Sequence, residues 1–406
     1  MLSSQPASIS PFDCALASYN HAIESDPQDE AAWHARGEHY ESRSELDRAI
    51  SDYSRVLAIN PDRLDARLDR AFCFASLNQH QAAIADYDWA LKLDPRRAHS
   101  WFLRGAAHES AGSIVQAIAD FRKAAEIDPT HDLAQVRLGS IYLEQGDHKL
   151  ALAKFDDALR ISPLLAAAWS GRGDVFREQK RYEEALKEYT RALNCEPDYA
   201  VAYDNRGIVH DELKQHDKAL ADYNRGIELD PVSFATYNNR GYCYRLQEDF
   251  ARAIPDYDKS LELNPDCGVT YYNRGLAWYH LSDYDRALAD YTCALEKGLP
   301  ANKQAALHCS LGHVWFMKDE HAKAISCYSK AIALDAANSD YYKNRAEVHE
   351  YDDNDKLAAA DYTRAIALDP ANADLYMSRC AVQFRRRRFL ASLADFWRGV
   401  KLILAE

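Results

Sequence analysis

Residues 199–231 have the sequence YAVAYDNRGIVHDELKQHDKALADYNRGIELDP, in which two apolar patterns with helical spacing are separated by a short polar turn. Tyr203 and Gly207 share one face of the first predicted helix, and Ala219 and Tyr223 share one face of the second. The second helix is expected to end at Asp-Pro, because proline disfavours helical geometry in the residue before it. The stretch therefore predicts a hairpin of two helices that cannot bury its apolar faces alone.

The same pattern recurs along the chain with a period of 34 residues. The closing prolines that keep this spacing are Pro27, Pro61, Pro95, Pro129, Pro163, Pro197, Pro231 and Pro265. Twelve residues before each of them is an alanine, eight residues before is Tyr or Phe, and ten residues after is Gly or Ala. A fixed period of this length indicates an array of stacked helical hairpins.

The motifs Trp-x-x-x-Gly and Ala-x-x-x-Tyr-x-x-Ala, with the closing Pro, resemble the tetratricopeptide repeat family over about residues 12–404. The resemblance implies an all-α fold, an α-solenoid of antiparallel helical hairpins stacked into a right-handed superhelix. It also implies that the first helix of each hairpin lines a concave wall. The family is one of binding modules without chemistry of their own.

The period predicts one continuous array over residues 12–406, with a half-repeat at 12–27 and about eleven full repeats that end near residue 404. Residues 1–11 are expected to form a flexible segment that is not a signal peptide. The array departs from its phase once, where three extra residues lie near 297–302. We interpret this insertion as a local bend in the solenoid.

Composition excludes several classes of function. Lys and Arg total 49 against 63 Asp and Glu, and the resulting net charge of −14 has the wrong sign for a general nucleic-acid binder. No apolar run approaches the ~18 residues of a membrane span. The nine cysteines form no CxxC pair, which favours a reducing, cytoplasmic location. Because no phosphate loop or nucleophile elbow is present either, we expect no enzyme activity, cofactor or metal.

The position before the Gly is Arg in nine of the eleven repeats, and the position sixteen residues later is acidic in the same nine. The two repeats without Arg have Leu138 with Lys154, and Leu311 with Cys327, so they lose the acid together with the base. An unpaired charge in a helix interface is costly. We therefore expect nine Arg–carboxylate pairs within repeats; the alternative is that these arginines face the groove and bind anionic groups.

The groove wall opposite the Gly positions is not uniform. Acidic residues gather in the fifth and sixth repeats, and aromatic residues that are out of phase with the core gather in the seventh to ninth. Exposed aromatics in a concave surface indicate a recognition site, and asparagines in this family can bind a peptide backbone. The predicted partner-binding residues are Asp204, Asn205, Asp211, Glu212, Asn239, Tyr242, Tyr272, Asn273, Tyr279 and Phe316.

Other features have weaker meanings. A clamp for a terminal carboxylate is disfavoured, because the matching positions in the sixth and seventh repeats (Asp204, Ile208, Asn238 and Tyr242) are not basic. Cys309 and His313 lie one helical turn apart, but zinc prefers four ligands and no second cluster is evident. The run 385–388 is all Arg and is either a solvated cap or a docking patch for an acidic partner.

These features together predict an interaction scaffold or adaptor that holds a partner segment with basic and apolar residues in its groove. The alternative is a structural solenoid that assembles with itself, end to end or as a homodimer. The last helix favours an interface at the C-terminal end of the array, since it carries Phe396, Trp397, Val400, Leu402 and Ile403, whereas terminal repeats normally present a polar outer face.

Overall fold

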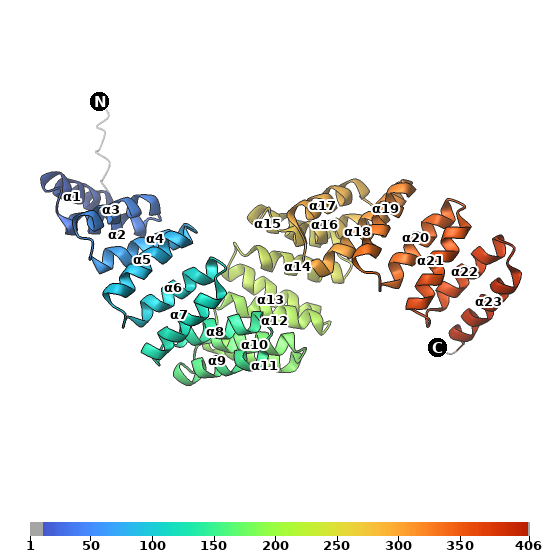
Figure 1. The fold of residues 1–406 in the computed structure, drawn as a ribbon, viewed down its shortest axis with the longest axis horizontal. Coiled ribbons are helices and arrows are strands. Elements are labelled where there is room, and N and C mark those ends of the chain that lie inside the picture. Colours follow the sequence, from blue (N-terminus) through green and yellow to red (C-terminus); the bar gives the residue numbers. More distant parts are fainter. Residues whose placement is uncertain (1–10, 405–406) are drawn as a thin grey trace, which may run out of the picture. The chain divides into compact units, whose positions relative to one another are not determined.

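The computed structural model describes residues 11–404, and within that range it contains 23 helices and no strand (Figure 1). After α1 (Pro11–Ser25), first and second helices of hairpins alternate. The first helices are α2 (Glu30–Ser42), α4 (Leu64–Ser76), α6 (Ala98–Ser110), α8 (Asp132–Glu144), α10 (Ala166–Glu178), α12 (Ala200–Glu212), α14 (Phe234–Leu246), α16 (Gly268–His280), α18 (Ala301–Met317), α20 (Ser339–Tyr351) and α22 (Ala373–Arg385). The second helices are α3 (Leu46–Ile59), α5 (His80–Leu93), α7 (Ile114–Ile127), α9 (His148–Ile161), α11 (Tyr182–Cys195), α13 (His216–Leu229), α15 (Phe250–Leu263), α17 (Tyr284–Lys297), α19 (His321–Leu334), α21 (Asp355–Leu368) and α23 (Phe389–Ile403).

The predicted all-α architecture of helical hairpins is confirmed. The half-repeat at 12–27 corresponds to α1, while the predicted flexible segment lies outside the described residues except for Pro11, which begins α1. Contacts divide the chain into two compact units, residues 1–202 and 203–406, with the division inside α12. Within each unit, first helices pack most extensively on the second helix that follows and next on the second helix that precedes. A single continuous array remains a prediction.

The two helices of a hairpin approach closely because a glycine of the first faces an aromatic ring of the second. A Cβ atom at Gly37 would lie 2.6 Å from the ring of Tyr53, which is fully buried. The same contact recurs in Gly105–Phe121, Gly139–Phe155, Gly173–Tyr189, Gly207–Tyr223, Gly241–Tyr257, Gly275–Tyr291 and Gly312–Tyr328. The periodic Gly and Tyr or Phe of the sequence are therefore one packing unit.

The turn inside each hairpin contains one residue in the left-handed region of φ. Only Gly112 and Gly146 are glycines there, with φ of +75° and +76°. The other turns place a side-chain-bearing residue at φ between 56° and 61°: Ser44, Asn78, Lys180, Lys214, Glu248, Ser282, Asp319, Asp353 and Arg387. This conformation disfavours residues with a Cβ, so most of these hairpins close despite a local backbone cost.

The connection between hairpins explains the spacing from proline to the aromatic residue of the next first helix. The indole Nε1 of Trp33 donates to the Pro27 carbonyl at 3.1 Å, and Trp101 donates to Pro95 at 3.0 Å. The aromatic residue thereby donates to the carbonyl of a proline in the turn that joins two hairpins, which fixes the first helix of one hairpin to the end of the hairpin before it.

The three-residue insertion lengthens a helix rather than a loop. α18 has 17 residues where every other first helix has 13, and its added turn precedes the regular register. Only residues 298–300 connect it to α17, and Gly298 adopts φ +86°. A Cβ atom at Gly268 would collide with the carbonyl oxygen of Gly298, so this connection requires a glycine on the neighbouring helix.

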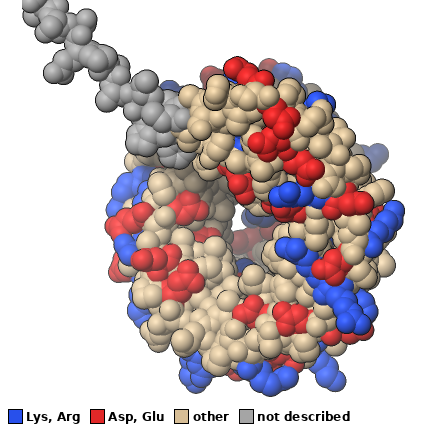
Figure 2. Space-filling model, turned by 90° about the vertical axis from the view of Figure 1, so that its left-hand side faces the viewer, with Lys and Arg blue, Asp and Glu red and all other residues tan. Residues whose placement is uncertain are grey.

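Within residues 11–404, no helix is long and apolar enough to cross a membrane. Figure 2 shows acidic and basic side chains interspersed over the face in view. This distribution agrees with the net charge in giving no sign of a broad basic surface for phosphates.

Candidate protein-binding site

All nine predicted Arg–carboxylate pairs form within hairpins. In eight of them Nε and Nη2 of the arginine donate to the two carboxylate oxygens at 2.6–2.8 Å. These pairs are Arg36–Asp52, Arg70–Asp86, Arg104–Asp120, Arg206–Asp222, Arg240–Asp256, Arg274–Asp290, Arg345–Asp361 and Arg379–Asp395. The ninth, Arg172–Glu188, is longer at 3.7 Å. The arginines are thus occupied inside the structure.

A third interaction of these arginines links successive hairpins, and the sequence analysis missed it. Nη1 donates to a polar side chain sixteen residues earlier, on the second helix of the preceding hairpin, as from Arg240 to Asn224 at 2.7 Å. The equivalent acceptors are Asn20, Ser54, Asp88, Asp156, Ser329, Thr363 and Asp258. The sequence contains a sign of this link, because the acceptor position holds Arg122 where the following repeat has Leu138 in place of the arginine.

Five of the predicted partner-binding residues gather around one cavity of about 210 Å³ in the unit of residues 203–406: Asp211, Glu212, Asn239, Tyr242 and Asn273. A neighbouring cavity of about 390 Å³ shares three of these residues and adds Lys214, His216 and Leu246. Tyr242 is exposed, at 38% of its full surface, and borders both cavities. The mixture of an exposed aromatic ring, acids and amides suits recognition of a polypeptide segment.

Several polar groups of this site are held by the protein itself. Asp211 is buried and accepts hydrogen bonds from the Tyr223 hydroxyl at 3.0 Å and from His216. Asn239 donates its amide to both oxygens of Asp204 at 3.1 Å. Asp211 therefore does not present an exposed charge, which leaves Glu212 as the exposed acid of the group.

Asn273 is also buried and donates to Asn238 at 3.1 Å. The side-chain amides of Asn239 and Asn273 are thus bound within the protein, while both residues line the smaller cavity. Asn205 is half-buried. It does not line either cavity.

The remaining predicted aromatics lie apart from the two cavities, and the expectation that they are exposed is wrong. Tyr272 and Tyr279 are half-buried and pack on the core cluster around Tyr291. Phe316 is half-buried as well and packs edge-on against the ring of Tyr351 at 5.1 Å between centroids. Their neighbours come both from their own hairpin, as Tyr291 does, and from the next hairpin, as Leu307 and Tyr351 do.

A basic residue from outside the clamp positions reaches the smaller cavity. Lys303 lies in the added turn of α18 and lines the smaller cavity together with Val269 and Asn273. The sequence analysis missed it because the residue belongs to the insertion, outside the period of 34. The cavity wall therefore combines one cation with the exposed Glu212.

The arginine run at 385–388 contacts the preceding hairpin through one of its members. Arg385 donates to Glu350 at 2.6 Å and to Asp355 at 3.0 Å, so one of the four arginines is bound to the preceding hairpin.

The last helix, α23, exposes several apolar side chains, and on it Trp397 is 62% and Ile403 51% exposed. Phe396 is exposed too, whereas Val400 and Leu402 are half-buried.

The fold and its periodic packing define a helical-repeat protein. Models described as tetratricopeptide repeat match residues 37–100, 74–132, 134–163, 164–231 and 234–267, which together make up more than half of the chain. The chain belongs to the tetratricopeptide repeat family. Among curated proteins, none matches this sequence.

Similar solved structures include the Cut9–Hcn1 hetero-tetramer of the APC/C, with TM-score 0.52, 14% identity, and coverage of 91% of this chain and 93% of that one. PilF from Pseudomonas aeruginosa has TM-score 0.49 and 22% identity over 53% of this chain and 97% of its own. A tetratricopeptide repeat protein from Parabacteroides merdae has TM-score 0.46 and 21% identity over 62% and 98%. The first of these similarities supports the helical-repeat fold alone.

Proposed function

We propose that the chain is a protein-interaction scaffold, without catalytic activity, that binds a partner segment at the two cavities around Tyr242. The observation that carries the proposal is the exposed Tyr242 ring between two cavities, with Glu212 on both and Lys303 on one. Aromatic anchors dominate many interfaces, where each hot spot contributes about 2 kcal/mol or more. Membership of a family of interaction modules supports the same function, and we propose a cytoplasmic location from the cysteine pattern.

The partner segment that suits this surface combines basic and apolar residues. Glu212 is exposed and offers a carboxylate to a lysine or arginine, and Tyr242 with Leu246 offers an apolar surface beside it. The contribution of Glu212 should weaken with salt, because exposed charges are screened over about 10 Å at 0.1 M ionic strength. Tyr272, Tyr279 and Phe316, which are also predicted to contact the partner, line neither of the two cavities.

A peptide-display selection on the full chain tests this proposal. Peptides enriched in basic and apolar residues should be selected by the natural sequence and lost with Tyr242→Ala, by about 30-fold in affinity for a typical hot spot. The matched control is Phe72→Ala, because Phe72 occupies the same position of an earlier hairpin and is 48% exposed. Selection that is unchanged by Tyr242→Ala, or lost equally with Phe72→Ala, would contradict the site.

The second candidate, self-assembly through α23, is favoured by the apolar face of that helix. Leu390 is 87% and Trp397 62% exposed, which is unusual for large apolar side chains close together. Light scattering should then show a concentration-dependent rise in mass that Trp397→Asp abolishes. Val115→Asp is the control, since Val115 is an isolated side chain, 80% exposed, on another helix. A constant monomer mass at high concentration would exclude self-assembly.

A further inference from the structure

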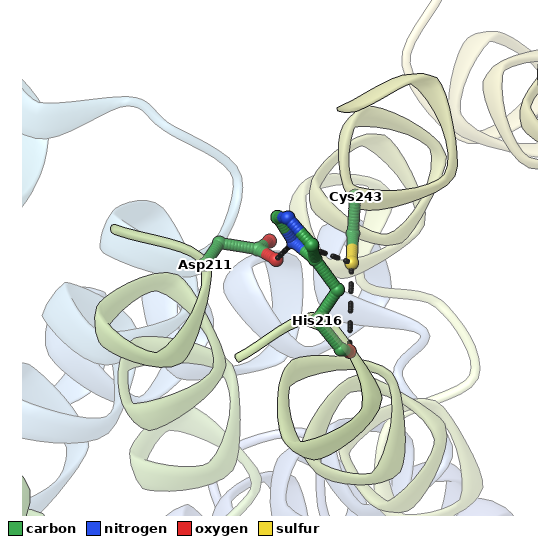
Figure 3. Close-up of side chains that lie close together, drawn as sticks. All are labelled: Asp211, His216 and Cys243. Atoms are coloured by element: carbon green, nitrogen blue, oxygen red, sulfur yellow. Dashed lines mark hydrogen bonds and ion pairs between the residues drawn. The ribbon is translucent and has the colours of Figure 1, made fainter. Parts of the chain in front are cut away.

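Three side chains that are typical metal ligands meet in the unit of residues 203–406. Asp211 lies at the end of α12, His216 is the first residue of α13, and Cys243 lies in the last turn of α14 (Figure 3). The Nδ1 atom of His216 is 3.0 Å from Oδ1 of Asp211 and 4.0 Å from Sγ of Cys243. All three ligand atoms lie within 4.8 Å of one another. The turn of one hairpin and the first helix of the next therefore direct three donors to one point.

These separations are close to those of a zinc site. With Zn–N and Zn–O near 2.0–2.1 Å and Zn–S near 2.3 Å, tetrahedral ligands are about 3.3–3.6 Å apart. The distances from His216 to Asp211 and Cys243 differ from these values by about half an ångström or less. The third separation, between Asp211 and Cys243, is bounded at 4.8 Å. The mixed O, N and S donor set also suits zinc better than magnesium or calcium, which prefer oxygen ligands.

Outer contacts hold two of the three ligands in place. The Tyr223 hydroxyl donates to Oδ2 of Asp211 at 3.0 Å, which leaves Oδ1 directed toward His216. The Gln247 amide donates to Sγ of Cys243 at 3.6 Å, a contact that a thiolate would strengthen. Metal ligands in proteins are commonly oriented by such partners. Asp211 and Cys243 are buried, while the His216 side chain is 24% exposed on the side of the larger cavity.

The same three residue types could form a catalytic triad, but their geometry does not fit one. In a triad the base uses one ring nitrogen for the nucleophile and the other for the carboxylate. Here Nδ1 of His216 is the contact for both Asp211 and Cys243.

We propose that Asp211, His216 and Cys243 bind a zinc ion, whose fourth position opens to the cavity of about 390 Å³ beside Glu212 and Tyr242. On binding, the Cys243 thiol loses its proton to solvent as the Zn–S bond forms. The fourth ligand is water or a donor atom from a bound segment. The expectation of no metal, which rested on the absence of a sequence motif, is replaced here by a site assembled from two hairpins. The inference does not depend on the proposed partner site.

An internal copy of the arrangement supplies a comparison without the histidine. Glu41, Leu46 and Cys73 lie 170 residues before the three proposed ligands, at equivalent positions of earlier hairpins. Glu41 accepts from the Tyr53 hydroxyl at 2.8 Å and from Cys73 Sγ at 3.7 Å. The acid, the thiol and the tyrosine thus belong to the repeated framework, and the histidine is what distinguishes the proposed zinc site.

The second group of potential ligands in residues 11–404, His34 with Glu38 and Asp69, is less suitable. Nε2 of His34 is 3.0 Å from Asp69, but its other nitrogen, Nδ1, is 3.7 Å from Glu38. The shortest contacts of the two carboxylates are to different ring nitrogens, the Glu38 side chain is 62% exposed, and the group contains no thiol. Cys309 and His313 have 3.9 Å between Sγ and Nε2 and belong to neither group.

The test uses the full chain, stripped of metal with a chelator and titrated with Co²⁺ and then Zn²⁺. We expect one equivalent of Co²⁺ to produce the charge-transfer absorption of a cobalt–thiolate bond, and Zn²⁺ to displace it. Cys243→Ser should abolish the band, and His216→Leu, which copies Leu46, should abolish saturable binding at one equivalent. Tyr223→Phe removes only the outer hydroxyl and should weaken zinc binding by about 10–100-fold.

Two controls separate this site from adventitious binding by other thiols. Cys73→Ser and Cys309→Ser should leave the stoichiometry and the absorption band unchanged. Leu46→His should add a second equivalent of Co²⁺, because it completes the earlier copy with Glu41 and Cys73. Absence of a cobalt–thiolate band, or a band that persists in both Cys243→Ser and His216→Leu, would overturn the proposal.

Discussion

Arg240 donates two hydrogen bonds to the carboxylate of Asp256, from Nε at 2.8 Å and from Nη2 at 2.6 Å. The Asp256 side chain is only 8% exposed. Arg240→Leu should therefore lower the free energy of unfolding by about 3–5 kcal/mol, since a buried carboxylate would lose its partner. Urea denaturation of the full chain, followed by circular dichroism, measures this loss.

A second substitution distinguishes the ion pair from general packing. Arg240→Leu with Asp256→Ala should recover much of the loss, as the natural combination of Leu311 with Cys327 indicates. Asn224→Ala should cost only about 1 kcal/mol, because it removes one hydrogen bond from a partly exposed arginine. A double variant no more stable than the single one would show that the charge on Asp256 is not the cause.

The glycine–ring contact predicts a cost for a single added methyl group. Gly275→Ala would place a Cβ 2.6 Å from the buried ring of Tyr291, and the helices must separate to admit it. We expect a loss of about 1–3 kcal/mol, typical of overpacking. Ala71 occupies the same position opposite Tyr87 in another hairpin, where the natural chain already has the methyl group. Ala71→Gly is therefore the matched comparison for Gly275→Ala. Thermal melting temperatures that are equal for Gly275→Ala and the natural chain would contradict this packing.

The left-handed turn residues predict changes of opposite sign. Glu248→Gly should stabilise the protein by about 0.5–1 kcal/mol, because Glu248 has φ +59° and glycine adopts this value without a steric cost. Gly112→Ala should destabilise it by about 1 kcal/mol through the backbone alone, since nothing lies within 4 Å of an added Cβ. Denaturant midpoints test both substitutions, and changes of the same sign in the two variants would refute the explanation.

Asp174 predicts a pH dependence. Burial raises the pKa of its carboxyl to about 6 in spite of the hydrogen bond from Tyr189, whereas the unfolded value is near 3.9. The folded state therefore binds the Asp174 proton more tightly than the unfolded state does. The resulting contribution to the free energy of unfolding is complete below about pH 4 and is lost as the pH rises through 6. The loss amounts to about 2–3 kcal/mol.

Comparison with a neutral variant isolates this effect. The difference in unfolding free energy between the natural chain and Asp174→Asn should shift in favour of the variant between pH 4.5 and pH 7.5. Carbon-13 NMR of the Asp174 carboxyl gives the titration midpoint directly. A midpoint near 4 would remove the basis of the prediction.

The hairpins and their ion pairs could be predicted because many copies repeat the same signal. Arg240 with Asp256 belongs to a series in which base and acid are kept or lost together at a fixed separation, whereas the close approach of Gly275 to the ring of Tyr291 comes from the structure. The left-handed turns could not be predicted in the same way, because Lys214 and Glu248 carry no sequence signature of positive φ. Their conformation is imposed by the two helices that they join.

The candidate site was predictable only in part, because it depends on what neighbouring hairpins cover. Tyr242 and Tyr279 both lie out of phase with the core of their own hairpins, yet Tyr242 is exposed and Tyr279 packs on the cluster around Tyr291. Lys303 reaches the cavity through an added helical turn that interrupts the period. Departures from the repeat, rather than the repeat itself, thus distinguish this surface.

The link from each arginine to the preceding hairpin restricts how such a gene can gain or lose repeats. Deletion of residues 225–258 would bring Asn224 sixteen positions before Arg274, where it replaces Asp258 as an acceptor. Deletion of residues 123–156, a segment of the same length, would instead bring Arg122 sixteen positions before Arg172 and set two cations against each other. We therefore expect the first deletion to keep the link between hairpins and the second to destabilise the chain, so that the order of the repeats restricts which of them can be removed.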